Sequence, residues 1–305
     1  MEKEKITEPY NYPYCEFDFT EWNPVQKQVY PYFEQDCNLV ISSSVASGKT
    51  VNAEAIFGYE LATKPNSKVV YVSPLKALGK EKFNDWSKHP TFKEFPKVLV
   101  SSDEIVTKSD FESSRMIIST IESMNIRCRK RDKWIKDVKV FVFDEAHLFN
   151  DENRGAGAES LLINFSIVNS DCRIVCLSGT LSNARDIAKW LKNLNGKKTY
   201  CISSDWRPTE LIQTIEVADS LFEQEKIIEK ICNKSKGEKT LIFVHSKKIG
   251  ETLCKYLKNN GIFTAFYNAD LRAGIKDRMI EDFKCSYSGF DVLITTSSLS
   301  MGINL

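Results

Sequence analysis

The sequence predicts an α/β protein that contains two doubly wound parallel sheets, of which the second is expected to be incomplete. Short apolar runs alternate with helical stretches, and most runs are continuously apolar instead of alternating with polar residues. Such runs are typical of parallel strands that helices cover on both faces. The alternation is interrupted around residues 204–209 and then begins again. With 305 residues the chain has room for two domains, expected at 1–203 and 204–305.

The apolar runs give the expected elements in order. In the first domain six strands are predicted, at Asn38–Ile41, Lys68–Val72, Lys97–Val100, Met116–Ser119, Val138–Phe143 and Arg173–Leu177. In the second domain, strands are expected at Leu211–Val217, Thr240–Val244, Phe263–Phe266 and Asp291–Thr295, and helices at Leu221–Cys232, Lys248–Asn259 and Ile275–Phe283. Small polar residues follow several strands, and open parallel sheets bind ligands at the carboxyl ends of their strands.

The charge balance excludes a general basic field. The 42 basic and 41 acidic residues leave a formal net charge of +1, so any surface that binds nucleic acid must be local. The basic stretch from Arg127 to Lys133, with Trp134 beside it, is one candidate. A solvated helix end explains the same stretch equally well.

The cysteines and the hydropathy pattern indicate an intracellular protein, cytoplasmic or in the nucleus or nucleoid. The nine cysteines contain no Cys-x-x-Cys pair and several lie in apolar runs, which predicts reduced core thiols and not a zinc site. The start of the chain lacks the apolar stretch of a secretory signal, and no window approaches 18 uninterrupted apolar residues. No membrane partner is expected.

A loop of small residues after the first predicted strand has the composition of a phosphate-binding loop. Ser47 and Gly48 leave room for the backbone to approach phosphates, Lys49 can reach the β- and γ-phosphates, and the Thr50 hydroxyl can bind a magnesium ion. The usual pattern begins with Gly or Ala, and here Ser43 stands in that place. Serine is small enough to keep the turn.

An acidic pair follows the predicted strand Val138–Phe143. Asp144 can hold the same magnesium ion, through water because Mg²⁺ keeps much of its hydration shell. Glu145 can position or deprotonate an attacking water. Either segment alone occurs often by chance, but in this order and spacing they predict a site for a nucleoside triphosphate and magnesium.

A glutamine ahead of the loop is a candidate for base recognition. The amide of Gln26 can pair with both N6 and N7 of adenine, and Phe19 or Trp22 can stack on the base. An ordinary surface role would explain Gln26 taken alone. Its position upstream of the phosphate loop favours adenine recognition.

Polar residues also follow other strands of the first domain. The segments 72–78, 119–122 and 177–183 each join a predicted strand to a helix start. Each can be a capped helix start, or it can offer hydroxyls, a helix N-terminus and Lys76 to a phosphodiester backbone. The shared edge of the sheet favours the second interpretation.

Taken in order, these motifs resemble those of the superfamily 2 helicases of the DExH/DEAH-box type, and most closely the superkiller-like branch of repair and RNA helicases. The resemblance covers essentially the whole chain. Its matching segments are Gln26, SSSVASGKT, SPLKAL, STIES, FDEAHLFNDENRGAGAE, LSGTLSNARDIAKWL, DWRP, LIFVHSK and VLITTSSLSMGINL. It implies two RecA-like domains of the P-loop NTPase type, ATP and Mg²⁺ as cofactors, and single-stranded DNA or RNA as partner.

The resemblance also assigns roles to individual positions. It implies catalytic roles for Lys49, Glu145 and His147, and magnesium binding by Thr50 and Asp144. Ser178 and Thr180, together with His147, would couple the nucleotide to the second domain. ATP would be bound by Gln26, Val45, Ala46, Ser47, Gly48, Lys49, Thr50 and Gly302, with Asn304 in the same motif as Gly302. Nucleic acid would be bound by Pro74, Lys76, Ser102, Thr120, Glu122, Ser246 and Thr296.

The chain departs from the family pattern in three places. Ser178, Gly179 and Thr180 stand for Ser-Ala-Thr and keep both hydroxyls. Asp270 introduces a carboxylate where the family has a glycine. The motif with paired arginines does not occur before Leu305, so we expect the polypeptide to be a fragment of a longer product. An arginine finger in related phosphoryl transfers increases the rate about 10³ to 10⁵-fold.

An ATP-dependent helicase or translocase is therefore the leading hypothesis for this chain. A nucleotide-responsive nucleic-acid-binding module without efficient hydrolysis is the alternative, since it would explain the absent arginines and Asp270. A small P-loop kinase would leave Gln26 and the second domain unexplained. The sequence does not decide between DNA and RNA, because no residue is identified as a reader of the 2′-hydroxyl. Protein partners are not indicated.

Overall fold

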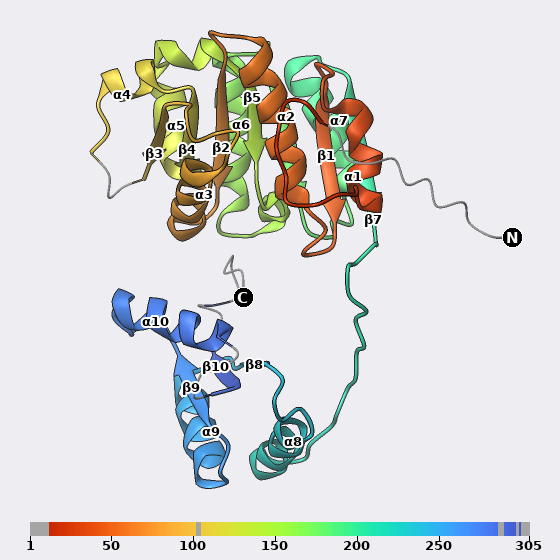
Figure 1. Ribbon diagram of the computed structural model, residues 1–305, viewed down its shortest axis with the longest axis vertical. Helices are drawn as coiled ribbons and strands as arrows, with labels where there is room; N and C mark the ends of the chain where they lie inside the picture. Colours follow the sequence, from red (N-terminus) through yellow and green to blue (C-terminus); the bar gives the residue numbers. More distant parts are fainter. Residues whose placement is uncertain (1–11, 102–104, 286–289, 297–298, 300–305) are drawn as a thin grey trace, which may run out of the picture. The chain divides into compact units, whose positions relative to one another are not determined.

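The structure, a computed structural model, consists of two units, Met1–Glu210 (unit 1) and Leu211–Leu305 (unit 2). It describes residues 12–101, 105–285, 290–296 and 299. Each unit contains its own parallel sheet with helices packed against it (Figure 1). This arrangement confirms the predicted fold class.

The sheet of unit 1 has seven strands in the order β3-β4-β2-β5-β6-β1-β7, and every pair of neighbours is parallel. All six predicted strands are present. The seventh, β7, was missed because it lies at the edge of the sheet and its partly exposed residues form no continuous apolar run. The strands are β1 (Asn38–Ser43), β2 (Lys68–Ser73), β3 (Lys97–Val100), β4 (Met116–Thr120), β5 (Val138–Phe143), β6 (Arg173–Ser178) and β7 (Thr199–Ser204).

Helices cover both faces of this sheet because neighbouring strand residues point in opposite directions. In β1, Leu39 and Ile41 join one buried cluster and Val40 joins the other. The first cluster lies under α1 (Pro24–Val29), α2 (Lys49–Thr63) and α3 (Lys76–Lys88), and the second under α5 (Ile121–Lys130), α6 (Gly155–Val168) and α7 (Ala184–Asn195). The short segments are η1 (Tyr30–Tyr32), α4 (Lys108–Ser113), η2 (Lys133–Asp137) and η3 (Ala146–Asn150).

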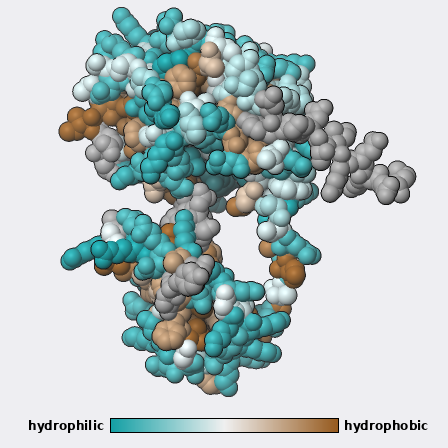
Figure 2. All heavy atoms as spheres, viewed as in Figure 1, coloured by the Kyte–Doolittle hydropathy of each residue, from teal (hydrophilic) through white to brown (hydrophobic). Residues whose placement is uncertain are grey.

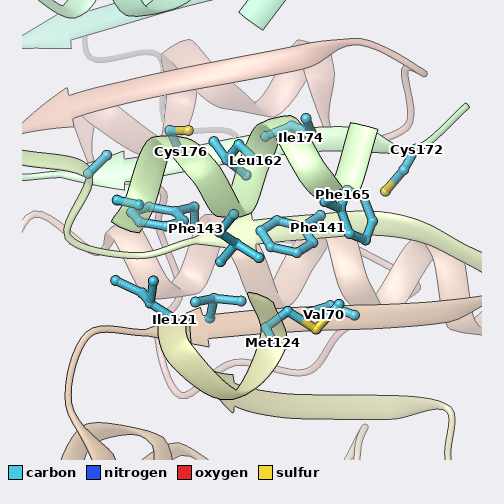
Figure 3. Packing of buried hydrophobic residues seen from close by; sticks show 14 of the residues in the cluster. Val70, Ile121, Met124, Phe141, Phe143, Leu162, Phe165, Cys172, Ile174 and Cys176 are labelled. Atoms are coloured by element: carbon cyan, nitrogen blue, oxygen red, sulfur yellow. The ribbon is translucent and has the colours of Figure 1, made fainter. Parts of the chain in front are cut away.

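The second cluster fixes the strand that carries the acidic pair. Phe141 and Phe143 of β5 pack against Leu162 and Phe165 of α6, with Ile121 and Met124 of α5 nearby (Figure 3). Complete burial of each such side chain stabilises the fold by about 1.5–3 kcal/mol. The end of β5 is therefore held in place by well-packed aromatic side chains.

Unit 2 has a smaller sheet in the order β8-β10-β9, again parallel. The three strands and three helices agree with the predicted elements within a few residues. They are α8 (Leu221–Lys234), β8 (Thr240–Phe243), α9 (Lys247–Asn259), β9 (Thr264–Tyr267), α10 (Ala273–Lys284) and β10 (Val292–Thr295). Ile294 and Leu257 are fully buried in its core.

The predicted strand Leu211–Val217 is wrong. These residues form no strand, and Ile212, Ile215 and Val217 are at least 77% exposed. Figure 2 shows exposed hydrophobic side chains on the segment between β7 and α8. The apolar alternation was a real signal, but strand formation needs a neighbouring strand, and none of the described strands pairs with this segment.

Several smaller predictions can be compared with the structure directly. None of the nine cysteines, all of which lie in the described part of the chain, forms a disulfide; seven of them are buried, and Cys285 is exposed. Within the described ranges there is no group of three or more His, Cys, Asp or Glu side chains suited to a metal ion, and no helix long and apolar enough to cross a membrane. Trp134 is buried and stacks on Phe111, over which the half-buried Arg127 also lies, so Trp134 belongs to the core. Arg129, Lys130 and Arg131 are exposed, and their contact with nucleic acid stays a prediction.

Candidate nucleotide and nucleic-acid site

The phosphate loop connects β1 to α2 at the carboxyl edge of the sheet. Gly48 caps α2 with φ +78°, and a Cβ there would lie 2.5 Å from Nε2 of Gln26. Both the backbone conformation and the space therefore require glycine. Ala46 also adopts a left-handed conformation, with φ 60°, which is strained for a residue with a side chain. Val45 is exposed and Ser47 is buried, with its hydroxyl 2.7 Å from that of Ser43.

The ammonium group of Lys49 lies within the loop. It donates hydrogen bonds to the carbonyl oxygens of Ser43 (3.0 Å) and Ser44 (2.8 Å). Burial lowers the pKa of Lys49, while Glu145 and Asp144 raise it. The loop thus holds a cation at the N-terminus of α2, where N–H groups and positive charge favour a bound phosphate, and this cation interacts with the acidic pair.

The adenine candidate Gln26 is attached to the same loop. Its side chain closes a capping box at the start of α1, where Oε1 accepts the backbone N–H of Asn23 at 2.9 Å. The side-chain Nδ2 of Asn23 in turn donates to the carbonyl of Ser47 at 3.0 Å. The structure therefore brings Gln26 and the phosphate loop together, and Asn23, which sequence reasoning did not select, is the link between them.

Asp144 follows β5 beside the loop and is half-buried. Its Oδ1 accepts the backbone N–H of Glu145 at 2.9 Å, and its Oδ2 accepts the hydroxyl of Tyr71. Burial raises the pKa of Asp144, and the hydrogen bond from Tyr71 opposes that shift. A carboxylate and the Thr50 hydroxyl are hard oxygen donors, and Mg²⁺ completes its shell with water and phosphate oxygens, so these residues fit that ion.

Glu145 and His147 form a pair after β5. Glu145 has φ 56°, a conformation that is rare without glycine and is found at functional sites. Its Oε2 lies 3.2 Å from Nδ1 of His147. The hydrogen bond raises the pKa of His147 and lowers that of Glu145. The backbone conformation of Glu145 therefore sets the direction of its side chain, and the contact with the His147 imidazole orients its carboxylate.

We expect His147 to titrate above its ordinary pKa of 6.5 in the nucleotide-free protein. A pKa raised in the folded state stabilises the fold fully at pH values below 6.5, and this contribution is lost as pH rises through the folded-state pKa. An NMR titration of the His147 ring protons measures the shift, with His147→Gln to assign the signal. Glu145→Gln should return the pKa toward 6.5. A pKa at or below that value in the parent protein would contradict the pairing.

Ser178 connects the acidic pair to the loop after β6. Its hydroxyl accepts the backbone N–H of His147 at 3.0 Å. The same loop is attached to β1, because the hydroxyl of Ser42 donates to the carbonyl of Gly179 and accepts the N–H of Leu181. Thr180 itself is exposed. Ser178 thus contacts the backbone beside the acidic pair, and the coupling roles of Ser178 and Thr180 stay predictions.

The nucleic-acid candidates of unit 1 lie along the other half of the same edge, after β2 and β4. Lys76 begins α3 and is exposed, and Pro74 precedes it. The Thr120 side chain caps α5 by accepting the N–H of Ser123, so the capping interpretation holds for this residue, and its contact with nucleic acid stays a prediction. Glu122 is exposed in the first turn of α5. Ser102 lies outside the described residues.

Arg154 was missed in the selection of site residues and connects these two loops. Its guanidinium donates to the carbonyl of Pro74 and lies 4.0 Å from a carboxylate oxygen of Glu122. The sequence signal was present, since Arg154 and Gly155 follow the acidic pair. A Cβ at Gly155 would lie 2.7 Å from the carbonyl of Phe149, so glycine lets the chain turn there and places Arg154.

We predict that Arg154→Ala weakens strand binding without changing nucleotide affinity. The variant loses a charge-assisted hydrogen bond of about 1.5–3 kcal/mol, and the loops after β2 and β4 lose their common anchor. Fluorescence anisotropy with single-stranded oligonucleotides and with a fluorescent ATP analogue measures the two affinities. Lys192→Ala, which removes an exposed positive charge near the end of α7, is the control. An equal loss in both variants would indicate a general charge effect.

In unit 2, the two described candidates follow neighbouring strands. Ser246 follows β8 and caps α9 by accepting the N–H of Ile249, and Thr296 follows β10. Because β8 and β10 are paired, the two residues lie at one edge of this sheet. Asp270 is exposed and forms an ion pair with Lys247 at 2.6 Å, which partly neutralises that edge. Gly302 and Asn304 lie outside the described residues.

Solved structures with a similar fold include helicases from two organisms. Dbp5 of Saccharomyces cerevisiae, bound to RNA and ADP BeF3, has a TM-score of 0.66 at 19% identity and covers 93% of this chain and 72% of its own. The helicase Lhr of Mycobacterium smegmatis, bound to ssDNA and AMP-PNP, has a TM-score of 0.67 at 18% identity, covering 92% of this chain and 40% of its own. These comparisons support the fold.

Sequence comparisons give the family. ATP-dependent DNA helicase MER3 of Saccharomyces cerevisiae is 27% identical over 95% of this chain and 28% of its own length. ATP-dependent DNA helicase Hel308 of Methanococcus vannielii is 33% identical over 79% of this chain and 35% of its own length. The chain thus spans about a third or less of these relatives. Residues 223–305 match the helicase conserved C-terminal domain, and residues 23–187 match the DEAD/DEAH box helicase family, to which this chain belongs.

Proposed function

We propose that this chain is the motor core of an ATP-dependent helicase or translocase that acts on single-stranded DNA or RNA. The observation that carries the proposal is one edge of the unit 1 sheet. There β1 and β5 present the phosphate loop and the acidic pair. The strand candidates follow β2, which is next to β5, and β4, which is next to β2. An intracellular location belongs to the same proposal.

The nucleotide half of this edge supports ATP and Mg²⁺ as cofactors. Lys49 and the N-terminus of α2 would bind the phosphates, and Gln26 would recognise adenine. Thr50 and Asp144 would hold the magnesium ion, which would neutralise charge on the phosphates. Glu145 would accept a proton from the attacking water and is oriented for this by His147.

A direct contact supports communication between the nucleotide half and the rest of the molecule. Ser178 accepts the N–H of His147, and the loop that follows Ser178 is tied to β1. Movement of the acidic pair during hydrolysis would therefore displace this loop. The proposed cycle alternates strand binding and release with the state of the nucleotide.

The test is ATP hydrolysis by the protein containing this chain, with and without single-stranded oligonucleotides. We expect single strands to stimulate ATP hydrolysis by the parent protein several-fold. We expect Lys49→Ala protein to show no ATP hydrolysis. DNA and RNA of the same base sequence, assayed in parallel, identify the substrate class. Tight binding of ATP and strand with background turnover would replace the proposal with a nucleotide-responsive binding module. Transfer of phosphate to an acceptor other than water would contradict both.

A further inference from the structure

Tyr71 contacts the carboxylate proposed to hold magnesium, and no motif includes it. Its side chain lies in the middle of unit 1, 1% exposed, and its hydroxyl donates a hydrogen bond to Oδ2 of Asp144. The other carboxylate oxygen accepts the N–H of Glu145. Both oxygens of Asp144 are therefore held by donors from the protein.

The sheet register explains why Tyr71 reaches this carboxylate. Tyr71 of β2 lies beside Val142 of β5, and Asp144 is two residues further along. Residues two apart in a strand point to the same face, so the Tyr71 ring and the Asp144 carboxylate share the face that α2 covers. This is also the face on which the phosphate loop leads into Thr50.

The ring of Tyr71 is fixed by its neighbours. It makes an edge contact with Trp86, with the ring centroids 5.1 Å apart. Trp86 is itself held by a 2.8 Å hydrogen bond from Nε1 to the buried carboxylate of Glu54 in α2. The phenol hydroxyl therefore has little freedom to move away from Asp144.

We propose that Tyr71 is a positioning residue that orients the Asp144 carboxylate toward the magnesium ion. The proposal rests on the proposed ATP-dependent function. Two donors prevent rotation of the carboxylate and leave one lone pair on each oxygen for the ion or its water. Groups that orient a metal ligand in this way change metal affinity or activity about 10 to 100-fold when they are removed.

The competing interpretation is that Tyr71 is only a core residue whose hydroxyl happens to find an acceptor. Loss of the hydroxyl would then change stability and leave the dependence on the divalent ion unchanged. The two interpretations therefore differ in metal affinity and not in the amount of folded protein.

The experiment compares the parent protein with Tyr71→Phe, which keeps the ring and removes the hydroxyl. Mn²⁺ binding to the ATP complex is followed by electron paramagnetic resonance, and affinity for a fluorescent ATP analogue is measured in EDTA. We expect Tyr71→Phe to weaken Mn²⁺ binding about 10-fold or more with unchanged affinity in EDTA. Tyr256→Phe removes a phenol–carboxylate hydrogen bond of 2.6 Å to Glu229 in unit 2 and is the matched control.

A double-mutant cycle keeps the test valid if Tyr71→Phe lowers stability. In an Asp144→Asn background, Tyr71→Phe should cause no further loss of Mn²⁺ affinity, because the group through which it acts is already changed. Equal Mn²⁺ affinity of parent and Tyr71→Phe, or a full additional loss in the Asn background, would overturn the proposal. If the parent showed no divalent-ion dependence at all, the proposed function would fail instead.

Discussion

Lys49→Ala is expected to abolish ATP hydrolysis and to reduce nucleotide affinity strongly. The ammonium group is the cation of the phosphate loop, held by the carbonyls of Ser43 and Ser44 beside Asp144 and Glu145. Loss of one preorganised hydrogen-bond donor that stabilises transition-state charge lowers the rate by about 10² to 10³. We therefore expect kcat/KM to fall by at least that factor, as measured by steady-state hydrolysis and by binding of a fluorescent ATP analogue.

The stability of this variant provides a second, independent readout. Burial lowers the pKa of Lys49, so the buried charge costs free energy of folding, but alanine also removes the hydrogen bonds to the Ser43 and Ser44 carbonyls. Because these two effects oppose each other, we expect the melting temperature to change little. Lys64→Ala, at the other end of α2, removes an i,i+4 ion pair with Glu60 and should leave hydrolysis unchanged. Normal hydrolysis by Lys49→Ala would rule out the phosphate loop as the nucleotide site.

Each part of the site that the sequence predicted is a single short segment of the chain. The phosphate loop and the acidic pair each follow a buried strand within a few residues, so strand patterning and residue type were sufficient. The structure shows how close they lie, since β6 alone of the described strands separates β1 from β5 in the sheet. Ser178 at the end of β6 is therefore well placed to contact His147.

The residues that were missed depend on the order of strands in space. In the sequence, Tyr71 looks like any other apolar residue of a buried strand. Its contact with Asp144 follows only from the pairing of β2 with β5. Arg154 follows an acidic segment and gives no local signal that it contacts Pro74, 80 residues earlier in the chain. A single sequence specifies which residues form a parallel strand more readily than which strand lies next to it, because the helical crossovers allow several orders.

The errors in secondary structure have related causes. Among the described strands β7 pairs with β1 alone, so most of its residues are only partly buried, and it lacks the apolar run that marked the other strands. Leu211–Val217 shows the converse, an apolar alternation without a partner strand among the described residues. Edge position and pairing are tertiary properties, and intrinsic β-propensity does not report them.

Glu145→Gln is expected to separate binding from hydrolysis. The amide keeps the size of the side chain but cannot accept a proton from water, and general-base catalysis contributes about 10² to 10⁴-fold. Single-turnover hydrolysis should slow by that factor while ATP affinity stays within about threefold, because Lys49 and the loop are unchanged.

The same variant should hold the strand-bound state for longer. If strand release follows hydrolysis, Glu145→Gln protein with ATP will dissociate from single strands more slowly than the parent, whereas both will dissociate alike without nucleotide. Glu159→Gln, exposed on α6, is the matched control for loss of one carboxylate. Hydrolysis near the parent rate would mean that a residue other than Glu145 is the general base. This residue would not depend on the contact between Glu145 and His147, which the variant also changes. Slow hydrolysis with unchanged strand release would instead mean that the hydrogen bond from His147 to Ser178 does not transmit the state of the nucleotide.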